Sequence, residues 1–310
     1  MTMIFFAGLA GIIVNTAMNY RYARRIVPLG LEFDFSYMWS IVRHALPYGV
    51  ALFLSVVYFK VDVILLSLME SQELADRSIA LYSLPMKIIE VLMVIGGFYL
   101  NSLLPSMTSL YEEKRTQELE NILVTSFKVL LSFGILFFVV GVLLREEVIR
   151  IIATPEYLSP NLVYTSADAF LVVLGAIVFY FLSLLSIYIF ITVKKHTIIL
   201  WINIIITLVN ILGNIWLIPK FSFMGAGVVT LFSQILLFVM TYLFSRKYIS
   251  FAIPGVFTLG AVVISTWIYV IGFWLLTYMS VTPLFDVVVY GGVLFGIGAY
   301  AQYQLIRRGK

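Results

Sequence analysis

Nine long apolar segments dominate the sequence, and each is long enough to cross a lipid bilayer. A transmembrane helix needs about 20 mostly apolar residues, because a rise of about 1.5 Å per residue must span a hydrocarbon core of about 30 Å. The sequence therefore predicts an all-α, polytopic membrane protein with about nine transmembrane helices. The predicted spans are residues 3–20, 45–69, 79–104, 119–144, 163–193, 197–217, 223–245, 252–279 and 285–306.

The composition excludes a soluble fold. Hydrophobic residues make up 62% of the 310 residues and charged residues only 12%, whereas a soluble domain carries about 25% charged residues. Lipid accepts this much apolar surface, and water does not. The chain contains no cysteine, so disulfide bonds, thiolate nucleophiles and thiolate metal ligands are excluded.

Lysine and arginine gather at alternate ends of the predicted helices. If the 21–44 loop lies in the cytoplasm, most of these cations lie at cytoplasmic ends, and the opposite ends carry only Arg77, Arg145, Arg150 and Lys220. The cytoplasmic loops of membrane proteins carry an excess of Lys and Arg. We therefore expect a multi-pass protein of the cell (cytoplasmic) membrane, with its C-terminus in the cytoplasm and the N-terminus of this chain outside.

The first apolar segment begins directly after Met1-Thr2. It has neither the basic residues nor the small-residue cleavage site that a signal peptide needs, so we expect a retained helix. An external N-terminus is unusual for a chain that starts in a hydrophobic helix. It predicts that an odd number of helices once preceded Met1.

Four ionisable residues lie inside the second and third predicted spans: Lys60, Asp62, Lys87 and Glu90. Counting about 1.5 Å per residue from the outer ends of the two spans places all four at a similar depth on neighbouring helices. Ionisable groups inside a bilayer are costly and mark pathways, relays or internal pairs.

Two interpretations of these charges remain open. In one, they form internal ion pairs that only set helix packing. In the other, Lys60 and Lys87 line an aqueous cavity and bind an anionic headgroup, so replacing either by alanine reduces transport but not membrane insertion. Lys87 and Glu90 are three residues apart and share a helix face, whereas Lys60 and Asp62 point in different directions. Asp62 and Glu90 are candidates for ion pairing or for ion coupling.

Polar residues elsewhere in the spans are secondary candidates. Asn203, Asn210 and Asn214 recur along one span, where hydrogen bonding between helices is the default and pore lining the alternative. Lys128 lies about two turns into its helix, and we expect its ammonium group to reach back to the membrane surface. Gly292 and Gly296 form a GxxxG pattern that suggests a close helix contact.

The residue inventory argues against an enzyme. The only histidines are His44 and His196, both at predicted cytoplasmic helix ends. No nucleotide-binding, zinc-protease or serine-hydrolase motif and no acidic metal-binding cluster is present. We expect no catalytic residue, metal, cofactor or nucleic-acid partner.

Several motifs resemble a known family over about residues 40–245. The resemblance is to the O-antigen-type polysaccharide exporters, which are lipid-linked oligosaccharide flippases of the multidrug/oligosaccharidyl-lipid/polysaccharide exporter superfamily. The order and spacing of these motifs together are more specific than any one motif. The motifs are ALPYG at 45–49, YFKVDVILLS at 58–67, ALYSLPMKIIE at 80–90, LPSM at 104–107, NILGN at 210–214, LIPK at 217–220 and MGAG at 224–227.

The resemblance implies two six-helix lobes that face a central cavity, followed by two extra helices. It assigns residues 1–20 to the last helix of the first lobe, 21–44 to a cytoplasmic linker, 45–246 to the six-helix second lobe, and 247–310 to two C-terminal helices and a cytoplasmic tail. The first five helices are then missing, which accounts for the external N-terminus. A truncated gene, a separate chain that supplies the first lobe, and a degenerate protein are the possible explanations.

The resemblance also implies a function in polysaccharide biosynthesis. The family flips a polyprenyl-diphosphate-linked oligosaccharide across the cytoplasmic membrane, and positive charge in the cavity, here Lys60 and Lys87, serves the diphosphate. The implied partners are this substrate, the bilayer, and a separate first lobe or glycan-assembly proteins. The alternatives are a multidrug-type cation antiporter, a membrane-bound glycan polymerase or acyltransferase, and a scaffold lobe that does not transport.

Overall fold

The computed structural model describes residues 2–26, 33–249 and 251–308. These residues form helices and short connections, with no β-strand among them. The chain divides into two compact units, Met1–Leu46 and Pro47–Lys310, and each is described by itself. All residues of the candidate sites lie in the second unit.

The first unit contains α1 (Thr2–Ile26) and the beginning of α2 (Phe35–Met69). Arg24 and Arg25 lie in the last turn of α1, where positive charge is favourable at the negative end of the helix dipole. Asp34 caps the start of α2, because its carboxylate accepts hydrogen bonds from the backbone N–H groups of Ser36 and Tyr37. Both helices lie where the sequence predicts the first two spans.

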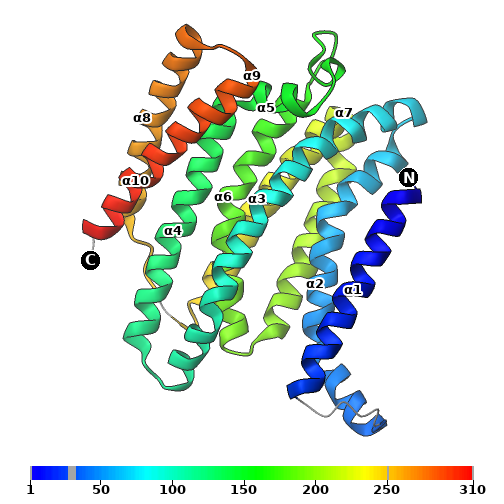
Figure 1. Cartoon of the computed structure of the whole chain (residues 1–310), viewed down its shortest axis with the longest axis vertical. Coiled ribbons are helices and arrows are strands. Elements are labelled where there is room, and N and C mark those ends of the chain that lie inside the picture. The colour runs from blue at the N-terminus through cyan, green and yellow to red at the C-terminus, as the bar shows by residue number, and fades with distance from the viewer. Residues whose placement is uncertain (1, 27–32, 250, 309–310) are drawn as a thin grey trace. The chain divides into compact units, whose positions relative to one another are not determined.

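The second unit is built around α6 (Ser166–Thr192), which packs against α3 (Gln72–Glu112), α4 (Thr116–Leu143) and α7 (His196–Ser245) (Figure 1). A helix that is apolar on all sides belongs in such a position, and buried residues occur along the whole length of α6. Its first turn is closed by a capping box, in which Thr165 and Asp168 exchange hydrogen bonds with each other's backbone N–H groups.

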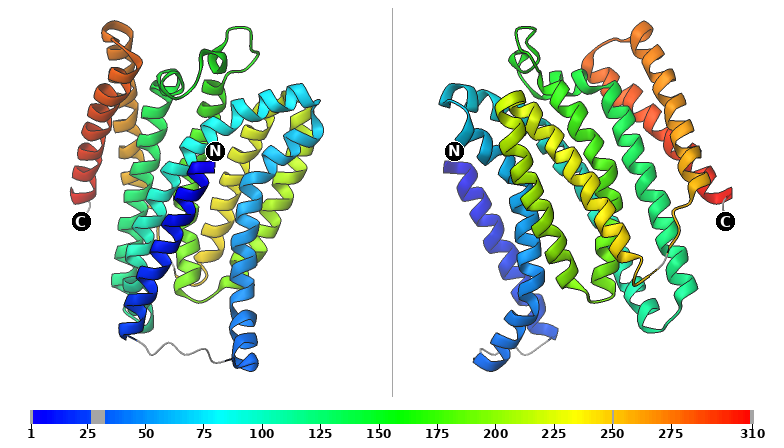
Figure 2. Two further views of the ribbon diagram at one scale, coloured as in Figure 1. Left: turned by 45° about the vertical axis from the view of Figure 1, so that its right-hand side comes forward. Right: turned by 180° about the vertical axis from the view of Figure 1, so that it is seen from behind.

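Two predicted spans, 197–217 and 223–245, lie in α7, and the chain folds back on itself between them (Figure 2). The reversal occurs at Ser222, whose φ of 52° and ψ of −139° are not helical. Gly213 faces Val229 across the two arms, which therefore run in opposite directions. The break falls just after Pro219, as the sequence predicts.

The remaining elements close one end of the bundle and add two helices. Helix α5 (Arg145–Ile152) and the 3-10 helix η1 (Pro155–Leu158) connect α4 to α6. Beyond α7 come α8 (Gly255–Met279), the short α9 (Pro283–Phe285), the π-helix η2 (Asp286–Gly291) and α10 (Gly292–Arg308). Helices α8 and α10 pack against each other and against α4.

The expected GxxxG contact is wrong. A Cβ atom built on Gly292 or Gly296 would meet no heavy atom within 4 Å, whereas one on Gly298 would lie 2.4 Å from Leu136 and 2.6 Å from Ile268. The close packing of α10 therefore depends on Gly298, which lies on roughly the opposite side of the helix from the face that the motif suggests.

Six of the helices are long and apolar enough to cross a membrane within the part of the chain that the structure describes. One of them, α7, contains two of the predicted spans, and all nine predicted spans fall in helical segments. The prediction of an all-α, polytopic membrane protein is confirmed. The six helices cover residues 72–112, 116–143, 166–192, 196–245, 255–279 and 283–307.

Candidate functional site

A cavity of about 650 Å³ lies between α2, α3 and α6. We call it the Lys60 cavity. Lys60 and Glu90 are its charged residues, and Asn101 and Tyr180 add polar groups to a largely apolar wall. Its lining residues are Leu52, Val56, Lys60, Glu90, Met93, Val94, Gly97, Phe98, Asn101 and Tyr180.

Lys60 and Glu90 form an ion pair across α2 and α3, with 2.5 Å between Nζ and Oε1. The two side chains remain 56% and 38% exposed, respectively. Because both side chains are exposed, the ion pair contributes little to stability. For the same reason its charges are accessible to a ligand. The expected link of Glu90 to Lys87 within one helix is not formed, because Lys60 reaches Glu90 from the neighbouring helix.

Lys87 lies one turn from Glu90 on the same side of α3, as the spacing of three residues requires. Its side chain is exposed, and it forms no ion pair with any described residue. It is not part of the Lys60 cavity wall itself. The structure therefore places one of the two candidate lysines in the cavity and the other beside it.

Asp62 points away from Lys60 and is fully buried. Its carboxylate accepts hydrogen bonds from the Tyr82 hydroxyl (2.7 Å), the Thr230 hydroxyl (2.7 Å) and the Asn214 amide (2.9 Å). None of the five ion pairs among the described residues includes it. Of the two expected roles, ion pairing is therefore not what the structure gives Asp62.

The asparagines of α7 have separate positions. Asn210 and Asn214 are fully buried, and their amides bond to Ser233 and to Asp62. These contacts are of the kind that the interhelical hydrogen-bonding interpretation predicts, and a pore-lining role for the two residues stays a prediction. Asn203 lies elsewhere.

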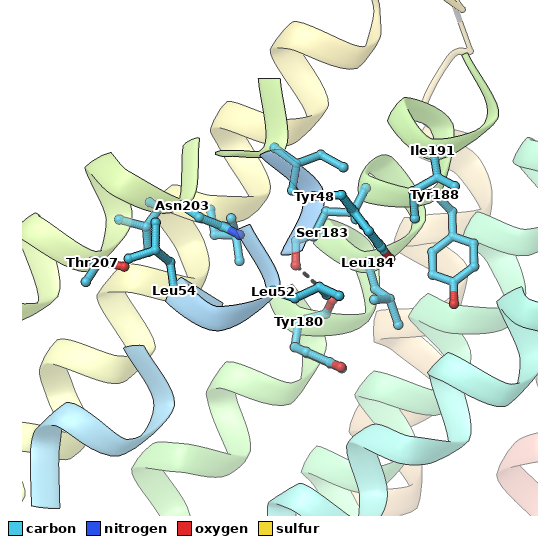
Figure 3. Close-up of a pocket in the computed structure, with 14 residues that line it drawn as sticks. Tyr48, Leu52, Leu54, Tyr180, Ser183, Leu184, Tyr188, Ile191, Asn203 and Thr207 are labelled. Atoms are coloured by element: carbon cyan, nitrogen blue, oxygen red, sulfur yellow. Dashed lines mark hydrogen bonds between the residues drawn. The ribbon is translucent and has the colours of Figure 1, made fainter. Parts of the chain in front are cut away.

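Asn203 lines a smaller cavity of about 220 Å³ between α2, α6 and α7, which we call the Tyr48 cavity (Figure 3). Tyr48, Tyr180 and Thr207 contribute polar groups to it, and apolar side chains form most of the rest. Leu52 and Tyr180 line both this cavity and the Lys60 cavity. The two cavities therefore adjoin at Leu52 and Tyr180.

The Asp62 cluster offers oxygen atoms to a cation. The Asn214 Oδ1 atom is buried without a hydrogen-bond partner in the described structure, and the Nδ2 atom of the same amide donates to Asp62. The described residues hold no group of three His, Cys, Asp or Glu side chains that suits a divalent metal. One carboxylate surrounded by neutral oxygens instead suits a proton or a hard monovalent cation.

Sequence reasoning missed Tyr82 and Thr230 as members of this cluster. Both lie inside apolar spans, where a lone hydroxyl is common and carries no distinctive spacing. Only the folded structure brings them to Asp62, since Tyr82 is 20 residues and Thr230 is 168 residues from Asp62 in the chain.

The comparisons with known proteins agree with this architecture. The sequence pattern of the MatE family matches residues 47–216, more than half of the chain. The chain therefore belongs to the MatE family, within the multidrug/oligosaccharidyl-lipid/polysaccharide exporter superfamily. No curated protein matches the sequence.

Among solved structures, the fold is similar to that of the lipid II flippase MurJ in an inward closed conformation, with a TM-score of 0.68 and 16% sequence identity. The match covers 93% of this chain and 59% of the flippase. The chain thus spans less than two thirds of that protein, and at this identity the likeness shows the fold alone.

Proposed function

We propose that the chain is part of a flippase that moves a polyprenyl-diphosphate-linked oligosaccharide across the cytoplasmic membrane for polysaccharide biosynthesis. The observation that supports this most is the exposed lysine of the Lys60 cavity, inside a segment of the membrane-spanning bundle. The family membership and the flippase-like fold agree with transport rather than catalysis.

Lys60 supplies the positive charge that a diphosphate needs. Charge-assisted hydrogen bonds to phosphate are about twice as strong as neutral ones, and a phosphate oxygen can replace the Glu90 carboxylate on the lysine. Glu90 keeps the ammonium group neutralised while no substrate is bound. Asn101 and Tyr180 offer hydrogen bonds to sugar hydroxyls, and Phe98 and Val94 offer apolar surface.

The Lys60 cavity is one wall of a transport path in this proposal. Residues 45–246 form the second lobe, residues 1–20 belong to the first, and residues 247–310 add the last two helices. A further lobe, in the same polypeptide or a separate chain, completes the cavity, since alternating access moves two halves around a central site.

The test is a flipping assay on the protein reconstituted in liposomes together with whatever lobe completes it. Lys60→Ala should lower the initial rate of flipping about tenfold or more, because one charged hydrogen bond contributes about 1.5–3 kcal/mol. Lys60→Arg should keep most of the rate, and Lys87→Ala should lower it less. Flipping is measured as the protection of a labelled polyprenyl-diphosphate oligosaccharide from an external glycosidase.

Lys220→Ala is the matched control, because this lysine lies over the Trp216 ring outside the Lys60 cavity. It should leave the flipping rate unchanged. Equal rates for Lys60→Ala, Lys87→Ala and the wild type, at equal amounts of inserted protein, contradict the proposal and leave the ion pair only a packing role.

The buried Asp62 favours a second candidate, a multidrug-type cation antiporter, because such a transporter uses a carboxylate without a lysine partner. The same Lys60→Ala variant separates the two functions. Removing a lysine from the cavity lowers the flipping of a diphosphate lipid, whereas it preserves or increases the efflux of a cationic dye.

A further inference from the structure

A second polar pocket lies between α3 and α4, and the transport proposal makes no use of it. Its volume is about 670 Å³, and we call it the Lys128 pocket. It shares no lining residue with the Lys60 cavity. Its lining residues are Tyr99, Leu103, Gln117, Glu120, Asn121, Ile122, Val124, Thr125, Ser126 and Lys128.

The Lys128 pocket and the Lys60 cavity lie on opposite faces of α3. At 3.6 residues per turn, Tyr99 points roughly 160° away from Asn101 around the helix. Asn101 lines the Lys60 cavity and Tyr99 the Lys128 pocket. Tyr99 also donates a hydrogen bond to Ser126 (3.2 Å), which ties α3 to α4 at the pocket wall. A ligand here is therefore separate from the transport path.

A polar stripe leads along α4 into the Lys128 pocket. Gln117, Asn121, Thr125 and Lys128 follow one another at intervals of four, four and three residues, which places them on one helix face. Gln117 and Asn121 are exposed near the start of the helix, Thr125 is half-buried, and Lys128 is buried. The stripe leads from the start of the helix to the ammonium group of Lys128.

Lys128 is only 7% exposed. Its ammonium group lies 5.7 Å from the centre of the Phe257 ring, and it forms no ion pair with a carboxylate in the described part of the chain. Phe257 of α8 lies beside this ammonium group, and its expected return to the membrane surface stays a prediction. A buried cation without an anion is costly, and a cation–π contact offsets only part of that cost.

We propose that the Lys128 pocket binds the phosphate of an anionic phospholipid from the surrounding leaflet. The ammonium group meets the phosphate, and Asn121, Thr125 and the Tyr99–Ser126 pair offer hydrogen bonds to it and to the glycerol. Leu103, Ile122 and Val124 supply apolar wall for the start of an acyl chain. Glu120 is the one carboxylate in the lining, and its charge disfavours a ligand that carries a second negative charge.

The location favours a lipid over a free anion. Lys128 lies 12 residues after the start of α4, about 18 Å along the helix. This depth is beyond the polar residues of the first turns and within the apolar part of the helix. A phosphate that carries acyl chains reaches it from the side of the bilayer, with its chains still in lipid.

The test measures lipid binding to the purified, delipidated protein in detergent. Phosphatidylglycerol and phosphatidylcholine with the same acyl chains are added, and bound lipid is counted by native mass spectrometry and by the shift in unfolding temperature. We expect phosphatidylglycerol to bind and stabilise more. Lys128→Met should weaken phosphatidylglycerol binding at least fivefold, and Lys128→Arg should retain it.

Two further variants keep the test decisive if Lys128→Met folds poorly. Asn121→Asp adds a negative charge at the exposed mouth and should weaken phosphatidylglycerol binding without disturbing the core. Lys247→Met is the matched control, because this lysine also lies over a phenyl ring, that of Phe244, but outside the pocket. It should bind the lipid like the wild type.

Equal phosphatidylglycerol binding by the wild type, Lys128→Met and Asn121→Asp overturns the site. Inorganic phosphate that stabilises the wild type as much as the lipid does, and loses this effect in Lys128→Met, overturns the lipid as the occupant. None of these measurements depends on flipping, so the result is independent of the proposed transport function.

Discussion

Two charged residues of α2, only two positions apart, have opposite environments. Lys60 is exposed in the Lys60 cavity and pairs with Glu90, whereas Asp62 is fully buried among hydroxyl and amide groups. Residues at i and i+2 are about 200° apart around a helix, so one side chain faces the cavity when the other faces the bundle interior. In the proposed flippase, this segment would bind substrate on one side and a coupling ion on the other.

At the residue scale, the prediction concerns the role of Asp62 in coupling flipping to an ion gradient. If flipping is driven by a proton or cation gradient, Asp62→Asn should abolish the dependence of the flipping rate on that gradient, because the amide keeps the size of the side chain but removes its charge. The rate is measured in liposomes with and without imposed sodium and pH gradients.

Tyr82→Phe is the companion variant, since it removes one hydrogen bond to Asp62 and leaves the charge in place. It should keep the gradient dependence and lower the unfolding free energy by about 1 kcal/mol. A gradient dependence that survives in Asp62→Asn would show that Asp62 has no part in coupling.

The reversal of α7 depends on one glycine. Ser222 leaves the helical region, and three residues later the chain passes so close to the end of the first arm that a Cβ atom on Gly225 would lie 2.6 Å from the Leu217 carbonyl oxygen. A backbone oxygen cannot rotate away as the tip of a side chain can. The two arms carry Asn214 and Thr230, so this turn also sets the geometry around Asp62.

Gly225→Ala is the prediction at the element scale. The added methyl group should lower the unfolding free energy by about 1–3 kcal/mol, the usual cost of overpacking, and lower the melting temperature in detergent. Gly296→Ala is the control, because its Cβ meets no atom within 4 Å. It should be neutral or slightly stabilising, since alanine favours helix more than glycine does. A melting temperature that falls equally in both variants would show that the turn is not the cause.

At the scale of the whole molecule, the loops that follow α3 and α6 contain the left-handed residues Lys114 and Lys194, each in a tight connection between antiparallel helices. These loops and the one after α7 lie at one end of the second unit (Figure 1). Lys and Arg gather there, so the positive-inside rule predicts that this end faces the cytoplasm.

This orientation is tested by labelling single cysteines, for which the chain is well suited because it has none of its own. Glu156→Cys, in η1, should react with a membrane-impermeant maleimide in intact cells, and Lys247→Cys should react only after permeabilisation. Both positions are exposed in the second unit, so unequal reactivity reports the side of the membrane. The reverse pattern would invert the proposed topology.

Much of the fold follows from the sequence alone. The length of an apolar segment and the prolines and charges that end it are local properties, so all nine predicted spans lie in helices. The break near Pro219 and the separation of Lys60 from Asp62 are local as well, because helix geometry sets them within one segment. The same local pattern placed Lys60 and Glu90 at a matching depth.

Only the tertiary structure decided which side chains meet. By spacing, Glu90 shares a helix face with Lys87, and it lies at a similar depth to Lys60 of the neighbouring helix; in the structure it pairs with Lys60. Packing likewise buries Asn210 and Asn214, gathers Tyr82 and Thr230 around Asp62, and covers Lys128 with Phe257. Each of these contacts joins residues from different helices, and the rotation of one helix about its neighbour is a property of the packed bundle that no single apolar segment specifies.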